Sequence, residues 1–285
     1  MITEAYKLSR PFENLRVLTI AGSDSSGGAG IQADIKTFAA LGCYGMSAIT
    51  AVTAQNTQGV RAILGIPPQM LRDQIDAVVE DLGAHAVKIG MLHSAEIVRT
   101  VAEAIDRHGL KKVVFDPVMV ATSGAVLIDD SAISILVGEL FSRSLLVTPN
   151  LDEACLLVGR KLHSEIDMEA AAHEMLHMGA NAVLLKGGHL PSDLVCDLLL
   201  TKDGEAHWMR APRIDTMNTH GTGCTLSSAI AAYLASGLTL RQSVEGARAY
   251  VRAALEAGAK VRTGAGNGPL NHSCAPMPMR LISLP

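Results

Sequence analysis

The sequence predicts an α/β protein with a mainly parallel central sheet flanked by helices. Short runs rich in β-branched residues alternate with longer Ala-, Leu- and Ile-rich segments of helical period, which is the pattern of repeated βαβ units. Of the 285 residues, 48% are hydrophobic and 18% charged, so a large core is expected. No composition shift or internal repeat marks a linker, and we expect one domain over residues 1–285, with an N-terminal extension over 1–15 and an irregular Gly- and Pro-rich tail over 262–285.

Each predicted element follows from its local pattern. Residues 16–21 (RVLTIA) are apolar and β-branched and predict the first strand. Residues 30–41 place Ile31, Ile35 and Phe38 on one face at helical spacing and predict the first helix. The other predicted strands are 47–53, 86–89, 112–115, 145–148, 182–185 and 194–200, with a small strand excursion over 57–66. The other predicted helices are 68–82, 95–108, one starting at Asn150, 168–178, 222–236 and 240–260.

Composition excludes several classes of function. Lys and Arg total 24 against 28 Asp and Glu, and aromatic residues are 3%, so no footprint for nucleic acid is present. No apolar run approaches the ~20 residues that span a bilayer, and the first residues lack the apolar centre of a signal peptide, so we expect no membrane association and a cytoplasmic location. The five cysteines are far apart and form no CxxC pair, which argues against disulfides and structural zinc.

Ligands of such sheets bind beyond the carboxyl ends of the strands, so polar or Gly-rich segments after a strand are candidate sites. These segments are 22–30, 55–56, 88–91, 116–119, 148–153 and 186–189, together with the turn 218–224 before a helix. Residues 28–33 fit G-x-G-x-x-A, the dinucleotide-binding pattern. About six residues separate them from their strand, and Gln55 and Asn56 stand where a ribose-binding carboxylate is needed. A tight turn for close packing is the alternative, and no P-loop string is present.

The turn His-Gly-Thr-Gly-Cys at 220–224 precedes a predicted helix. Two glycines let backbone amides turn outward at the positive end of the helix dipole, which predicts an anion hole for a phosphoryl group or an oxyanion. Cys224 lies in the first turn, where the pKa of a thiol is lowered. An ordinary helix cap with an inert cysteine is the alternative.

Charged side chains follow three other strands. Asp116 comes directly after a buried strand, and Asn150 with Glu153 nearly forms a capping box. Asp116 and Glu153 together suit a Mg²⁺ held mostly through water and phosphate. Lys186 follows a further strand, and a solvated lysine is the alternative there.

Together these strings resemble the ribokinase superfamily and, within it, the hydroxymethylpyrimidine/phosphomethylpyrimidine kinase family. The strings are LTIAGSDSSGGAGIQADIKTFAALG, ITAVTAQNTQGV, KIGML, DPVM, TPNLDEA, LLKGGH and APRIDTMNTHGTGCTLSSAIAA, and the resemblance covers about residues 16–272. It implies a three-layer α/β kinase, usually a homodimer, that uses ATP and Mg²⁺ to phosphorylate 4-amino-5-hydroxymethyl-2-methylpyrimidine and then its monophosphate. Asn267 departs from the His usual in the family, which puts a tail contact near the nucleotide in doubt.

The resemblance also implies roles for single residues. Substrate contacts fall on Gly22, Asp34, Gln55, Met91 and Val118. The anion hole and the presumed base fall on Gly221, Thr222, Gly223 and Cys224. Metal contacts fall on Asp116 and Glu153, and contacts to the nucleotide and its phosphates on Asn150 and Lys186. The residues agree with this, because a neutral aminopyrimidine needs donors and acceptors such as a carboxylate and an amide. Asp34 lies four residues after Gly30 and can face the pocket, although a solvated helix residue is the alternative.

Three competing functions fit parts of the sequence. A pyridoxal/pyridoxine kinase performs the same chemistry on another hydroxymethyl heteroaromatic, and Gln55 favours the pyrimidine. An acyl- or thiol-transfer enzyme would use Cys224 as nucleophile, but His220 is too near in sequence to be assumed as its partner. A non-catalytic nucleotide sensor is disfavoured by the presence of Cys224, Asp116 and Glu153.

Overall fold

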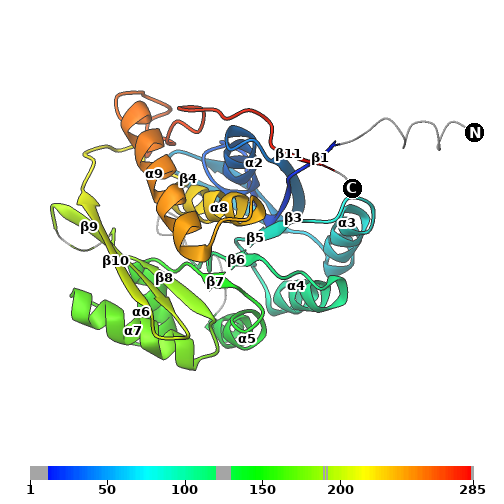
Figure 1. Ribbon diagram of the computed structural model, residues 1–285, viewed down its shortest axis with the longest axis horizontal. Coiled ribbons are helices and arrows are strands. Elements are labelled where there is room, and N and C mark those ends of the chain that lie inside the picture. Colours follow the sequence, from blue (N-terminus) through cyan, green and yellow to red (C-terminus); the bar gives the residue numbers. More distant parts are fainter. Residues whose placement is uncertain (1–11, 120–129, 189, 191, 284–285) are drawn as a thin grey trace, which may run out of the picture.

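The computed structural model describes residues 12–119, 130–188, 190 and 192–283. Within them, nine strands form one sheet in the order β10-β9-β8-β7-β6-β5-β2-β3-β4 (Figure 1). The strands are β2 (Arg16–Asp24), β3 (Tyr44–Asn56), β4 (Gly59–Gly65), β5 (Ala86–Ile89), β6 (Val113–Phe115), β7 (Leu146–Val147), β8 (Ala182–Lys186), β9 (Leu194–Thr201) and β10 (Ala206–Pro212). The inner strands from β8 to β3 are parallel, whereas β9, β10 and β4 pair antiparallel at the two edges. The prediction of a mainly parallel sheet is confirmed.

Helices cover both faces of the sheet. They are α2 (Gly30–Ala40), α3 (Pro68–Asp81), α4 (Ala95–His108), α5 (Asp130–Leu140), α6 (Leu151–Val158), α7 (Glu165–His177), α8 (Thr222–Ala235) and α9 (Leu240–Gly258). Side chains of α3 to α7 share a buried cluster with one face of the strands, and those of α2, α8 and α9 share a second cluster with the other face. The expected three-layer arrangement is therefore present. No described helix is both long and apolar enough to cross a membrane.

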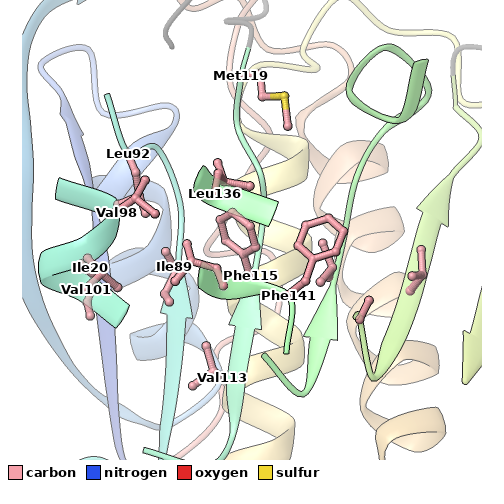
Figure 2. Packing of buried hydrophobic residues seen from close by; sticks show 14 of the residues in the cluster. Ile20, Ile89, Leu92, Val98, Val101, Val113, Phe115, Met119, Leu136 and Phe141 are labelled. Carbon is pink, nitrogen blue, oxygen red and sulfur yellow. The ribbon is translucent and has the colours of Figure 1, made fainter. Parts of the chain in front are cut away.

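The inner strands are apolar on both sides because both faces are covered. Val113 and Phe115 of β6 belong to the cluster under α3 to α7, and Val114 between them belongs to the cluster under α2, α8 and α9. Figure 2 shows Phe115 beside Phe141 in the first cluster, where both rings are fully buried. Truncating such a ring to Ala costs about 3–5 kcal/mol, so this layer contributes strongly to the stability of the sheet beneath the site.

Several elements differ from the sequence prediction. The excursion over 57–66 is strand β4, as expected, but β10 and α5 were not predicted. Helix α7 begins at Glu165, earlier than the predicted 168, because the Ser164 hydroxyl accepts a hydrogen bond from the Asp167 amide at 3.2 Å and caps the helix.

The two ends of the chain contain a small sheet of their own. Strand β1 (Phe12–Asn14) pairs antiparallel with β11 (Leu281–Ser283), which places the described ends side by side (Figure 1). The Arg280 amide donates to the Gly42 carbonyl at 2.8 Å, and the Met277 amide donates to the Ala40 carbonyl at 2.7 Å. The tail predicted as irregular is therefore tied to the end of α2 and closes with a strand.

Candidate active site

A cavity of about 690 Å³ lies at the carboxyl ends of the parallel strands. The predicted site residues that line it are Gly22, Gln55, Met91, Asp116, Val118, Asn150, Glu153, Lys186, Gly221, Thr222, Gly223 and Cys224. They come from the ends of six strands and from the first turn of α8. One cavity thus brings together twelve side chains and glycines that are up to about 200 residues apart in sequence, as the strand-end rule predicts.

One end of the cavity, here called the neutral end, is formed by Gly22, Gln55 and Met91, which carry no charge. A Cβ atom added to Gly22 would lie 2.6 Å from Met91 Cε, so a larger residue there would push the end of the Met91 side chain aside. The Gln55 carbonyl oxygen Oε1 accepts a hydrogen bond from Thr53 Oγ1 at 3.2 Å. Among the described residues, no hydrogen bond occupies the Gln55 amide nitrogen, which leaves two donors for a ligand. A flat, uncharged ring with acceptor atoms suits this end.

Asp34 is not among the residues that line the cavity, so the contact of Asp34 with substrate stays a prediction. Its side chain is fully buried beneath the cavity, where Oδ2 accepts from Thr19 Oγ1 at 2.6 Å and from Lys88 Nζ at 2.9 Å, and Oδ1 accepts from Ser228 Oγ at 2.7 Å. Asp34 is three residues after Ile31 and therefore shares the buried face of α2. The alternative of a solvated helix residue is wrong for the same reason.

Lys88 belongs to the candidate segment 88–91, but no role was predicted for it. It lines the cavity at the end of β5, and its side chain is fully buried. Burial by itself lowers the pKa of Lys88, but the Asp34 carboxylate outweighs burial and the net shift is upward, so the ammonium stays charged. The signal in the sequence was a lysine inside the apolar strand AVKI, which is a rare position for an unpaired charge.

The glycine-rich segment after β2 is not a dinucleotide-binding turn. The amides of Gly28 and Ala29 donate to Asp24 Oδ2 at 3.0 and 2.8 Å, so the chain's own carboxylate occupies the place of a phosphate. A Cβ atom on Gly28 would lie 2.4 Å from His220 Cδ2, which explains the small residue there. The alternative of a tight turn for close packing is the one observed.

The predicted anion hole forms at the start of α8. Gly221 has a φ of 82°, and a Cβ atom there would lie 1.8 Å from the Gly28 carbonyl oxygen, so glycine is required. The Thr222 amide is used within the turn, where it donates to the Thr219 carbonyl at 3.2 Å. In the described part of the chain, no hydrogen bond engages the amides of Gly223 or Cys224. Two donors at a helix N-terminus are thus available to an anion.

Cys224 differs from the expectation of a lowered thiol pKa. Burial raises the pKa of Cys224 to about 11, although Lys88 opposes the rise. The nearby Gly30 amide opposes the rise only weakly. His220 does not face the sulfur, because its Nε2 lies 2.8 Å from Asp24 Oδ2. Among the described residues, no histidine is hydrogen-bonded to the Cys224 sulfur, so the Cys–His pair that the thiol-transfer alternative needs is not found in that part of the chain.

Asp116 and Lys186 form a buried ion pair beside the anion hole. Lys186 Nζ lies 2.8 Å from Asp116 Oδ1, so Lys186 is not the solvated lysine of the alternative. Asp116 also accepts from Thr148 Oγ1 at 3.1 Å and from Ser227 Oγ at 3.2 Å. A Cβ atom on Gly223 would lie 3.3 Å from Lys186 Nζ, which shows how close the ammonium is to the free amides.

Glu153 and Asn150 form the capping box that the sequence suggested. Glu153 Oε2 accepts from the Asn150 amide at 2.8 Å, and Asn150 Oδ1 accepts from the Glu153 amide at 2.9 Å. Burial raises the pKa of Glu153 to about 7, with Lys186 opposing and Asp116 adding to the rise. Glu153 therefore titrates near neutral pH beside a second carboxylate. A cation placed between the two groups would lower the pKa of Glu153 strongly.

Comparison with known proteins identifies the family of this site. The family model described as phosphomethylpyrimidine kinase matches residues 24–271. A hydroxymethylpyrimidine/phosphomethylpyrimidine kinase of Rhizobium meliloti is 50% identical over 256 residues, covering 90% of this chain and 96% of the relative. The thiamine biosynthesis bifunctional protein ThiED of Geobacter sulfurreducens is 50% identical over 266 residues, and the match spans 93% of this chain but 54% of that protein.

A solved structure of a related kinase also matches this chain. The ADP complex of Bacillus subtilis pyridoxal kinase superimposes with a TM-score of 0.85 at 35% identity, covering 92% of this chain and 98% of that one. Sequence identity is higher to the pyrimidine kinases than to this pyridoxal kinase. The chain belongs to the phosphomethylpyrimidine kinase family.

Proposed function

We propose that the protein transfers a phosphoryl group from ATP to the hydroxymethyl oxygen of 4-amino-5-hydroxymethyl-2-methylpyrimidine, and then to the resulting monophosphate, in thiamine biosynthesis. The observation that carries this is one continuous cavity. It joins the neutral end at Gln55 and Met91 to the free amides of Gly223 and Cys224. The relatives named as kinases of these two pyrimidines support the same substrates.

The acceptor ring binds at the neutral end of the cavity. Gln55 recognises the ring by donating hydrogen bonds from its free side-chain amide. Gly22 leaves space for the ring beside Met91, and Val118 packs against the ring. The nucleotide lies toward the apolar wall formed by Ile214, Val251 and Leu255. The transferring group then lies between them at the start of α8.

The charges of the site stabilise the phosphoryl group as it moves. The amides of Gly223 and Cys224 donate to its oxygens, and Lys186 and Lys88 add two buried positive charges nearby. The thiolate form of Cys224, a minor fraction at neutral pH, takes the proton of the alcohol and becomes a thiol as the new bond between oxygen and phosphorus forms. Asn150 holds the first turn of α6, and Glu153 with it, through the capping box.

Asp116 and Glu153 would hold a magnesium ion. The described residues contain no cluster of three or more ligating side chains, so a dedicated metal cage is absent from that part of the chain. Two buried carboxylates fit an ion bound mainly through water and phosphate oxygens. Magnesium supplies charge neutralisation on the phosphates when bound. Asp116→Asn should lower kcat, with partial rescue at raised Mg²⁺, and wild-type turnover at limiting Mg²⁺ would contradict the assignment.

An ADP-release assay tests the substrate. The pyrimidine alcohol, its monophosphate and pyridoxal are supplied at equal concentrations, and we expect the largest kcat/KM with the two pyrimidines. Preference for pyridoxal would favour the second candidate, a pyridoxal kinase, which the similarity to the Bacillus subtilis enzyme supports. The homodimer implied by the family is tested separately by analytical ultracentrifugation.

A further inference from the structure

The loop of residues 24–30, which joins β2 to α2, is built around one buried carboxylate. Asp24 Oδ1 accepts hydrogen bonds from the amide and hydroxyl of Ser26 at 2.9 and 2.7 Å, and Oδ2 accepts from the amides of Gly28 and Ala29. Asp24 is 2% exposed. Because an ionised carboxylate only accepts hydrogen bonds, these donors together hold the 24–30 loop in one conformation.

A fifth donor to this carboxylate comes from the other side of the cavity. His220 Nε2 lies 2.8 Å from Asp24 Oδ2, and the ring is buried with its residue 5% exposed. Since the carboxylate only accepts, Nε2 is assigned the hydrogen. The His220 amide donates to the Gly268 carbonyl at 3.0 Å, which fixes the backbone from the opposite side. His220 therefore links the 24–30 loop to the 220–224 turn.

Two backbone contacts lie directly beside this link. The Gly28 carbonyl packs against Gly221 so closely that a Cβ atom on Gly221 would lie 1.8 Å from the oxygen. The Gly30 amide is close enough to the Cys224 sulfur to oppose the rise in its pKa. The 24–30 loop thus contacts the 220–224 turn at His220 and at Gly221. A shift of the loop would move the two residues whose amides and sulfur face the cavity.

We propose that the hydrogen bond between Asp24 and His220 positions the anion hole for phosphoryl transfer. It clamps the 24–30 loop onto the 220–224 turn, so that the Gly223 and Cys224 amides stay aligned with the transferring group. The proposal rests on the proposed function of those amides. A misplacement of about 1 Å at a reacting centre costs about 10²-fold in rate, which gives a single buried hydrogen bond a large effect on catalysis. His220 is a positioning residue here, because its ring is engaged with Asp24 and not with substrate.

Three substitutions at position 220 test the clamp. His220→Ala should lower kcat about 10- to 100-fold for the pyrimidine alcohol and for its monophosphate alike, because both transfers use the same amides. The Ser25 hydroxyl of the same loop exchanges hydrogen bonds with the Gln55 backbone at 2.9 Å, so the KM of the alcohol can rise as well, and the fall in kcat is the diagnostic change. His220→Gln brings an amide nitrogen near the Nε2 position and should restore most of kcat. His220→Asn places its nitrogen nearer Nδ1 and should not.

A matched control is available in the same chain. His108 Nε2 lies 2.7 Å from Asp76 Oδ1 in a partly buried pair on α4 and α3, outside the cavity. His108→Ala should leave kcat and KM unchanged, and thermal unfolding of every variant reports its folding.

The outcomes separate this proposal from the proposed function. If wild-type protein phosphorylates the pyrimidine but His220→Ala keeps kcat within threefold, or raises KM at constant kcat, the clamp is refuted. If His220→Ala does not fold, equal kcat values for His220→Gln and His220→Asn refute it instead. A wild-type protein inactive on both pyrimidines would overturn the proposed function.

Discussion

Replacing Cys224 by Ala should separate the two phosphoryl transfers by the chemistry of their acceptors. The first acceptor is a neutral alcohol that must lose its proton as the new bond forms, so a positioned base accelerates the step. The second acceptor is a phosphate whose second pKa is ~6, which is largely deprotonated at pH 7 and needs no base. The Ala variant keeps both backbone amides of the anion hole. We therefore expect a loss confined mainly to the alcohol.

The structure sets the size of this effect and its pH dependence. Burial raises the pKa of Cys224 to about 11, so roughly one thiol in 10⁴ is ionised at pH 7. A general base contributes about 10²- to 10⁴-fold, but only the ionised fraction acts, so the loss for the alcohol should be small at pH 7 and reach up to about 10²-fold at pH 9, while the loss for the monophosphate should stay below about threefold. The ionised fraction rises about tenfold per pH unit below the pKa. The alcohol rate of the wild type should therefore climb between pH 7 and 9, while that of the variant should not.

Single-turnover rapid-quench rates with both acceptors, measured from pH 7 to 9, provide the test. Cys155→Ala is the matched control, because this thiol lies outside the cavity. Equal losses for the two acceptors, or a pH slope that survives in Cys224→Ala, would refute the role of the thiol as base. Cys224 would then matter only through the shape of the anion hole.

Three further predictions concern groups around the same cavity. Burial raises the pKa of Glu153 from 4.5 to about 7, so between these pH values the folded protein holds a proton that the unfolded chain releases. The free energy of unfolding should therefore fall by about 3 kcal/mol as pH rises from 4.5 to 7. Urea unfolding at pH 5 and pH 8 should show that difference shrink in Glu153→Gln. Gln55→Met should lower kcat/KM for the pyrimidine about 5- to 150-fold, because it leaves a polar group of the ring unpaired at a cost of ~1–3 kcal/mol. The loss for pyridoxal should be smaller, and equal losses would mean that Gln55 does not recognise the ring. Lys88→Met should destabilise by about 3–5 kcal/mol because it leaves Asp34 buried and unpaired, and adding Asp34→Asn should recover most of the loss in the same urea titration.

The inner part of the fold could be predicted because its sequence signal is strong. Strands β5, β6 and β8 are buried and apolar except for Lys88 and Lys186, and amphipathic helices separate most of them. Strand β10 escaped prediction because it lies at the edge of the sheet, where its half-exposed residues show no clean alternation of polar and apolar side chains. Helix α5 was missed because its segment DSAISILVGEL carries Ile and Val together with a glycine, which weaken a helical pattern.

The site was predictable as a set of positions but not as a set of pairings. Strand ends and glycines indicate where a cavity forms, and the motif order indicates the family. Which charge meets which depends on contacts between distant segments, such as Asp34 with Lys88 and Asp24 with His220. Asp34 and Lys88 come from α2 and β5, which sequence spacing does not relate. These pairs therefore follow only from the tertiary structure.

The state of Cys224 shows why magnitudes must be compared before a local rule is applied. A helix N-terminus stabilises a thiolate by about 0.3–1 kcal/mol when exposed and by up to about 2 kcal/mol when partly buried. The shift of its pKa from 9.0 to about 11 corresponds to about 3 kcal/mol against the thiolate, even with the Lys88 ammonium nearby. Desolvation therefore exceeds the combined effect of the helix end and the lysine, and Cys224 is a protonated thiol at neutral pH. Because a protonated thiol cannot accept a second proton, a base role for Cys224 falls to its thiolate form, which is about one molecule in 10⁴ at pH 7 and becomes more abundant only as pH rises toward the pKa.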